Sequence, residues 1–142
     1  MKNVFFDSSV ILAASKSKSG GSSFILMLCR KGRIKGYISR YVVYEIKKSS
    51  SILNQQEKQR LNFLILQCKL EIIDEPSEKL NEKYYSMINK KDASILASAI
   101  STTMDYLLTL NTKHFMTPEL KIAVKPMKIV TPKDFIIIEK FR

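Results

Sequence analysis

Short, mostly apolar segments alternate with segments of helical periodicity along almost the whole chain. The apolar segments are rich in β-branched and aromatic residues, and they lie at Lys2–Phe6, Ile34–Ser39, Leu70–Ile73, Tyr106–Leu110 and Met127–Val130. A strand that is apolar on both faces has to be covered on both faces, as in a parallel sheet between two layers of helices. The alternation therefore predicts an α/β fold with a mostly parallel central sheet.

Helical segments fill the intervals between these strands. Apolar spacing and capping residues predict helices at Phe24–Arg30, Arg40–Lys48, Gln55–Gln67, Ser77–Ile88 and Asp92–Thr103, and a last short helix that begins at Thr131–Pro132. Ser39 is expected to cap the second of these helices, and Gly32 to end the first. A loop of small residues is expected after Phe6, with a flexible stretch at residues 15–23. We see no linker to a second unit and expect residues 1–142 to form a single domain.

Size and composition restrict the class of protein. The chain has 142 residues and is 45% hydrophobic, which is enough for a packed core and too much for a disordered chain. No apolar run approaches the roughly 20 residues that a membrane helix needs, and the first run reaches Asp7 before a signal-peptide core forms. We therefore expect no membrane association and a cytoplasmic location. Cys29 and Cys68 have no Cys or His close in sequence, so we expect buried, reduced thiols rather than a disulfide or a zinc site.

Positive charge is concentrated in the first half of the chain. The formal net charge is +11, and residues 1–60 carry twelve basic and three acidic side chains, whereas residues 61–142 carry twelve and ten. Such a surface attracts phosphate backbones, although a lysine-rich surface can also serve solubility alone. Tyr37, Tyr41 and Tyr44 lie among these basic residues, where they could stack on bases or serve the core.

Three carboxylates and one amide lie where the predicted strands end or the helices begin. Asp7 and Asn111 come just after strands, Asp92 opens a helix, and Glu45 lies in the second turn after a strand. Ligands of open parallel sheets bind at the carboxyl ends of the strands, so these four side chains can meet at one edge. Grouped carboxylates are costly to bury without a cation, and carboxylate and amide oxygens suit a hard divalent metal.

Each acid also has a simpler explanation. An aspartate after a strand often caps a turn, which would account for Asp7. Asp92 could be a first-turn acid favoured by the helix dipole, and Glu45 a helix-surface charge. The order of the acids within the strand–helix alternation favours a shared site over three independent explanations.

Five segments in chain order carry a family resemblance. The sequence resembles the PIN-domain family of nucleases, and especially the compact toxin subunits of VapBC toxin–antitoxin pairs. Phe5–Leu12 is similar to the family's opening motif, in which a strand leads into Asp-x-Asn/Ser/Thr and an apolar run. Tyr44–Ile46 resembles the second motif, a Glu early in a helix, and Lys91–Ala97 resembles the third, an Asp that opens an Ala-rich helix. Asp105–Phe115 resembles the fourth motif, a strand followed by a polar residue, and Ile129–Phe135 resembles the last strand with its closing helix turn.

The resemblance implies a flavodoxin-like three-layer α/β/α sandwich and metal-dependent cleavage of RNA. Carried over by motif, Asp7, Glu45 and Asp92 are the catalytic acids, and together with Asn111 they hold Mg²⁺ or Mn²⁺. The hydroxyl of Ser9 would not bind the metal itself but would orient a carboxylate that does, and Thr109 is expected to act similarly. An antitoxin partner and a homodimer are likewise implied, with the predicted helices at 24–30 and 55–67 as candidate dimer surfaces.

Asn111 departs from the commoner pattern of the family, in which an aspartate takes this position. An amide oxygen can ligate a cation but brings no negative charge, so a second metal should bind more weakly. Asp105 is the nearest spare acid, but it precedes the strand and should point away from the site. His114 is the only histidine; we expect it in a loop, near Phe115 or in solvent, rather than in catalysis.

The sequence leaves two other functions open. A PIN-like domain that is catalytically weak or inactive could bind RNA or a protein partner, and the neutral Asn111 leaves room for this alternative. A phosphatase that uses Asp7 as its nucleophile would need a second Asp or a Gly-Thr pair after it, whereas Ser8, Ser9 and Val10 follow. We therefore expect a metal-dependent ribonuclease whose substrate is RNA.

Overall fold

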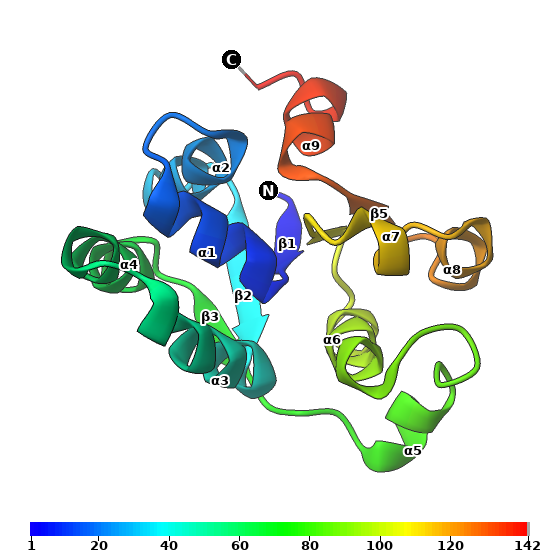
Figure 1. Ribbon diagram of the computed structural model, residues 1–142. Helices are drawn as coiled ribbons and strands as arrows, with labels where there is room; N and C mark the ends of the chain where they lie inside the picture. Colours follow the sequence, from blue (N-terminus) through cyan, green and yellow to red (C-terminus); the bar gives the residue numbers. More distant parts are fainter. Residues whose placement is uncertain (142) are drawn as a thin grey trace.

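The computed structural model describes residues 1–141 and contains a central parallel sheet with helices on both sides (Figure 1). The five strands have the order β3-β2-β1-β4-β5, and each neighbouring pair is parallel. The predicted α/β class and parallel sheet are therefore confirmed. The strands are β1 (Asn3–Phe6), β2 (Lys35–Ser39), β3 (Glu71–Ile73), β4 (Tyr106–Leu108) and β5 (Lys128–Val130).

The helices divide between the two faces of the sheet according to the direction of each crossover. From β1 to β3 the chain moves towards one edge, and from β4 to β5 it moves towards the other, so right-handed crossovers place α1–α4 on one face and α5–α8 on the opposite face. The bounds are α1 (Ser8–Lys16), α2 (Gly21–Arg30), α3 (Arg40–Ser49), a 3₁₀ turn (Ser50–Ile52), α4 (Gln55–Gln67), α5 (Glu78–Glu82), α6 (Lys90–Ser101), α7 (Thr112–Phe115), α8 (Pro118–Ala123) and α9 (Pro132–Ile138). The last helix, α9, packs against α2.

The central strands form the middle of the core, as their apolar sequences require. Val4, Phe5 and Phe6 of β1 are completely buried, and so are Leu107 and Leu108 of β4. Phe5 lies opposite Tyr37 of β2 on one side and Leu107 on the other. Because these three β1 side chains are completely buried, the carboxyl end of the strand is fixed by packing on both faces of the sheet.

Two predicted helix boundaries are confirmed. The Ser39 hydroxyl accepts a hydrogen bond from the backbone N–H of Val42 at 3.2 Å, which caps α3. Gly32 follows α2 with a φ of 72°, a conformation that favours glycine. Among residues 1–141 no helix combines the length and the apolar character that a bilayer crossing demands.

The predicted loop after β1 is wrong, because α1 begins there. The Asp7 carboxylate accepts the N–H of Ser8 and so caps the helix, while Val10, Ile11 and Ala14 are fully buried along one face. Packing of this face outweighs the weak helix preference of the serines. The stretch at residues 15–23 is accordingly shorter as a loop, since α1 continues to Lys16 and α2 begins at Gly21.

The helix predicted from Ser77 to Ile88 is shorter in the structure. It ends at Glu82, and tight turns replace it, with Tyr84, Tyr85 and Met87 each donating to the carbonyl three residues earlier. These turns bury Tyr84 and Ile88 in the core. The short helices α7 and α8 were not predicted, because four to six residues carry too little periodicity to be recognised.

Candidate active site

Asp7 follows β1 directly, and three donors fix its carboxylate. Oδ1 accepts the N–H of Ser8 at 2.9 Å, and Oδ2 accepts the hydroxyls of Ser9 and Thr109, each at 2.8 Å. The two hydroxyls are held in turn, because Ser9 Oγ accepts the N–H of Leu110 and Thr109 Oγ1 accepts the N–H of Asn111. Asp7 is only 5% exposed. Backbone from two neighbouring strand ends therefore orients one carboxylate.

Glu45 lies in α3 and reaches the end of β1 through Ser8. The Ser8 hydroxyl donates to Glu45 Oε1 at 3.2 Å, and no side chain or backbone group of residues 1–141 donates to Oε2. Burial raises the pKa of Glu45 above its usual value, and the negative charges of Asp7 and Asp92 raise it further. The Ser8 hydrogen bond and the charge of Lys91 act in the opposite direction.

Asp92 is the third residue of α6, two residues inside the helix rather than at its first position. Asn89 caps the helix, with its Oδ1 accepting the N–H of Asp92 at 3.0 Å and its Nδ2 donating to Asp92 Oδ2 at 2.7 Å. Only 13% of the Asp92 side chain is exposed. Burial is the largest cause of its raised pKa, and the charge of Asp7 adds to it.

The three acids therefore lie within one another's electrostatic reach at the carboxyl edge of the sheet. Asp7 raises the pKa of both Glu45 and Asp92, and Asp92 raises that of Glu45. Like charges act in this way only when they are close and poorly screened. We call this region, formed by Asp7, Glu45, Asp92 and Asn111, the acidic rim.

Asn111 and His114 occupy the side of the acidic rim next to Asp92. Asn111 precedes α7, and its Nδ2 lies 3.3 Å from His114 Nδ1. The same ring nitrogen lies 3.5 Å from Asp92 Oδ2. The predicted loop histidine is thus in a helix, and its ring, 48% exposed, reaches two residues of the rim. Its spacing from Asn111, three residues in a helical turn, is the signal that could have placed it there.

The family follows from a comparison with known sequences. A model of the PIN domain matches residues 3–113, which is more than half of the chain and includes all of the acidic rim. The chain belongs to the PIN domain family. The match confirms the predicted family, and members of this family are nucleases. A search among curated proteins gave no match.

Solved structures of similar fold agree with this PIN domain. The VapBC2 complex from Rickettsia felis, bound to a DNA fragment from its promoter, is 20% identical, with a TM-score of 0.64 and coverage of 89% of this chain and 96% of that one. DNA-bound VapBC from Salmonella typhimurium is 14% identical, with a TM-score of 0.66 and coverage of 93% and 99%. PAE2754 from Pyrobaculum aerophilum is 13% identical, with a TM-score of 0.63 and coverage of 99% and 97%. At these identities the likeness concerns the fold.

Nucleases of the PIN family generally need a divalent metal ion, and the acidic rim has the donor chemistry for one. Three carboxylates and one amide supply hard oxygen ligands, and a cation would relieve the repulsion that raises the pKa values of Glu45 and Asp92. Within the described part of the PIN domain, no three His, Cys, Asp or Glu side chains form a ready-made ligand cluster. The acidic rim therefore suits a divalent cation by the type of its ligand atoms and by its negative charge.

Glu75 is a further residue of this region that the sequence reasoning missed. It follows β3, and its two carboxylate oxygens accept the N–H of Tyr41 in α3 and the hydroxyl of Ser94 in α6. It thus ties the helix of Glu45 to the helix of Asp92. The rule that selected Asp7, an acid just past a strand's carboxyl end, would also have selected Glu75.

The remaining expectations concern residues away from the rim. Asp105 accepts the N–H of Asn3 at 2.8 Å, at the amino end of β1, so it points away from the rim as predicted. Cys29 and Cys68 are buried free thiols, also as predicted. Burial is the main cause that raises the pKa of each. Such thiols are unreactive and serve the packing of the PIN domain.

Proposed function

We propose that this PIN domain is a metal-dependent ribonuclease and the toxin of a toxin–antitoxin pair. The observation that carries the proposal is the orientation of Asp7 by Ser9 and Thr109, beside two carboxylates whose pKa values are raised. Asp7, Glu45 and Asp92 are the catalytic acids, and Asn111 completes the oxygen ligands of Mg²⁺ or Mn²⁺. Ser9 and Thr109 are the hydroxyls that orient Asp7.

Each side chain has a part in phosphodiester hydrolysis. A bound divalent cation supplies positive charge at the scissile phosphate and makes water more acidic. Glu45 has a raised pKa, and its Oε2 accepts no hydrogen bond from residues 1–141, so this side chain can accept a proton from the attacking water. Asp7 and Asp92 would hold the cation through their carboxylate oxygens. Asn111 contributes an amide oxygen without charge, so a second cation binds weakly or only with the substrate phosphate.

RNA is the substrate in this proposal because the chain is strongly basic in its first half. Exposed Lys16, Lys18, Arg30, Lys47 and Lys48 carry positive charge on the α1–α4 side of the molecule. Such side chains hold phosphates that flank the cleavage point without reading sequence. The rim alone would repel RNA, so both the cation and this basic surface are needed.

An antitoxin protein, a homodimer and a cytoplasmic location complete the proposal. Two structures of similar fold are VapBC complexes, which motivates the antitoxin partner. Buried free thiols suit a reducing compartment, which motivates the cytoplasm. Residues 1–142 would act as a single PIN domain. Co-expression with any small protein that a neighbouring gene encodes, followed by light scattering of the purified proteins, tests the partner and the dimer together.

A cleavage assay on a mixed RNA pool tests the enzymatic part. The wild-type protein should cut in Mg²⁺ or Mn²⁺ and not in EDTA, and Asp92→Asn should abolish cutting while retaining the fold. Asp134→Asn is the matched control, because Asp134 is a first-turn acid of α9 whose N–H is capped by Thr131, as that of Asp92 is capped by Asn89. Cutting by Asp92→Asn at the wild-type rate would contradict the assignment.

A PIN domain that binds RNA without cutting it is the second candidate. It is favoured by the neutral Asn111, whose amide faces the His114 ring. Retained RNA binding with no product across a titration of Mg²⁺ and Mn²⁺ would support this module and exclude the nuclease.

A further inference from the structure

Tyr41 and Tyr44 form a stacked pair on α3 that the proposed chemistry does not use. Their ring centroids lie 6.0 Å apart, with 27° between the planes. Tyr41 is partly buried against the core, whereas Tyr44 is 56% exposed. The inner ring thus packs beside the outer one, and more than half of the Tyr44 surface is open to solvent.

The pair lies beside the acidic rim. Tyr44 precedes Glu45 in sequence, and Tyr41 lies one helical turn before it. After burial, the causes that raise the pKa of Tyr41 are the charges of Glu45, Tyr44, Asp92 and Glu75. Glu75 also accepts the backbone N–H of Tyr41. Tyr41 is therefore close enough to the acidic rim for the charges of Glu45 and Asp92 to act on it, and Glu75 fixes its backbone.

Cations continue the same surface of α3 away from the rim. Lys47 and Lys48 lie three and four residues after Tyr44, so they neighbour it on the helix, and both are exposed. The exposed positions of α3 are Arg40, Tyr44, Lys47 and Lys48. An aromatic face with cations around it matches a ligand that carries flat bases and phosphates. A protein interface would instead surround Tyr44 with apolar residues and deplete lysine.

The other tyrosine of this segment has a different place. Tyr37 lies in the middle of β2, its hydroxyl donates to Asn3 Oδ1 at 3.4 Å, and Lys35 Nζ lies 5.4 Å from its ring centroid. Asn3 begins β1, so Tyr37 points towards the amino ends of the strands. Only Tyr41 and Tyr44 are at the rim.

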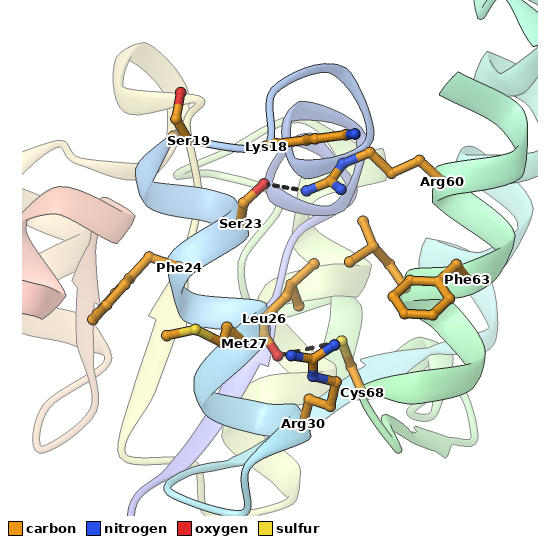
Figure 2. A pocket seen from close by; sticks show the side chains of 12 residues that line it. Lys18, Ser19, Ser23, Phe24, Leu26, Met27, Arg30, Arg60, Phe63 and Cys68 are labelled. Carbon is orange, nitrogen blue, oxygen red and sulfur yellow. Dashed lines mark hydrogen bonds between the residues drawn. The ribbon is translucent and has the colours of Figure 1, made fainter. Parts of the chain in front are cut away.

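A second exposed aromatic among cations offers an internal comparison. Phe63 of α4 is 48% exposed and lines a groove of about 390 Å³ between α2 and α4, together with Lys18, Arg30 and Arg60 (Figure 2). We call this the α2–α4 groove. Here the Arg60 guanidinium is already engaged, donating to the carbonyl of Ala14 and to the Ser23 hydroxyl. An exposed aromatic near cations is thus not by itself a base-binding surface.

We propose that Tyr44, supported by Tyr41, is a platform on which an unpaired base of the substrate stacks next to the scissile phosphate. Lys47 and Lys48 hold the phosphates on the far side of that base. This inference rests on the proposed ribonuclease function and makes the substrate single-stranded at the cleavage point, because a base inside a duplex has no free face to offer.

Two short unstructured RNAs of equal length test the platform, one with all its bases and one with abasic sugars in the centre. Binding is measured by fluorescence anisotropy with Mn²⁺ in the Asp92→Asn background. The base-bearing RNA should bind more tightly, and Tyr44→Ala should weaken its binding about tenfold while leaving the abasic RNA unaffected. Tyr44→Phe should behave like the parent. Tyr44→Leu, which keeps apolar bulk without a π face, should behave like Tyr44→Ala.

Phe63→Ala is the matched control and should change binding of neither RNA. If Tyr44→Ala leaves the preference for the base-bearing RNA intact, the platform is wrong, even if the wild-type protein cleaves RNA. If Tyr44→Ala releases a co-expressed protein partner and leaves that preference unchanged, the surface is a protein interface and the platform is again wrong. If the preference collapses in Tyr44→Ala but the wild-type protein cleaves nothing, the platform stands and the nuclease proposal fails.

Discussion

The acidic rim and the α2–α4 groove both place charged groups beside the core, but they hold those charges differently. Arg60 Nε donates to the Ala14 carbonyl at 2.8 Å, Arg60 Nη2 donates to Ser23 Oγ at 3.0 Å, and the Cys68 thiol donates to the Leu26 carbonyl. In the rim the carboxylates also accept hydrogen bonds, but the negative charge of Asp7 adds to the burial that raises the pKa values of Glu45 and Asp92. Paired groups hold helices together, whereas groups kept in mutual repulsion indicate a binding or catalytic site. This difference predicts that changes in the rim act mainly on activity, and that loss of the paired Arg60 in the groove acts on stability.

Asp7→Ala should have the largest effect, because Asp7 is where the rim is best ordered. Cleavage of RNA should fall by about a thousandfold or more, the scale expected when a group that organises transition-state charge is removed. Stability should also fall, by about 1 to 3 kcal/mol, since Ser9 and Thr109 each lose an acceptor. Single-turnover cleavage and urea unfolding measure the two effects separately. Wild-type cleavage by this variant would remove the rim from the mechanism.

Arg60→Met should have the opposite profile. The variant loses two hydrogen bonds from a charged donor, so the free energy of unfolding should fall by about 2 to 3 kcal/mol. kcat/KM of the folded protein should stay unchanged, because the groove contributes no group to the rim. Lys58→Met, an exposed lysine on the same helix, is the control and should be neutral. A large loss of activity in folded Arg60→Met would show that the two regions are coupled.

Removing the hydroxyls behind Asp7 should have an intermediate effect. Ser9→Ala and Thr109→Val each leave the carboxylate in place but take away one of its donors, so cleavage should drop about tenfold to a hundredfold. Thr109→Ser should restore most of the activity, because it keeps the donor. The apparent affinity for Mn²⁺, taken from the metal dependence of cleavage, should weaken in parallel. If activity falls and metal affinity does not, the hydroxyls act on packing rather than on the carboxylate.

Sequence reasoning reached the sheet and the rim because both depend on local signals. The apolar runs of β1 and β4 were long enough to predict buried strands, and the rule for carboxyl ends of parallel strands placed Asp7 at the edge. The capping position of Ser39 was equally local. The catalytic roles of the rim residues stay a prediction, since geometry places side chains and does not show what they do.

The features that were missed depend on contacts distant in sequence. The serines that follow Asp7 favour a loop by propensity, and only burial of Val10, Ile11 and Ala14 makes them helical. His114 reaches Asp92 across 22 positions of sequence, and Glu75 bridges two helices that no local pattern relates. Local rules could have placed Glu75 and His114 near the rim, but a single sequence does not show which distant residues they contact.

The effect of Glu45→Gln on stability is the smallest and the most diagnostic, because it separates repulsion from hydrogen bonding within the rim. Burial and the charges of Asp7 and Asp92 raise the pKa of Glu45. The folded protein then holds the proton more tightly than the unfolded chain, so stability is greatest below the ordinary pKa of glutamate and falls as the pH rises through the raised value. Glutamine removes this loss and can still accept from Ser8, whose bond to Glu45 Oε1 would remain. At neutral pH the variant should be more stable by less than about 1 kcal/mol, since Glu45 is only partly buried and solvent screens its charge.

Urea unfolding in EDTA across a pH series measures this gain, which should vanish as the pH falls below the ordinary pKa of glutamate. Glu82→Gln, at an exposed position of α5, should show no such gain. Added Mn²⁺ should reverse the order of stability, because the cation binds a carboxylate more tightly than an uncharged amide, and a ligand stabilises the form that binds it more tightly. If Glu45→Gln instead destabilises the metal-free protein at neutral pH, the Ser8 hydrogen bond outweighs the repulsion. The rim would then be a satisfied cluster like the α2–α4 groove, and the contrast from which its function is inferred would disappear.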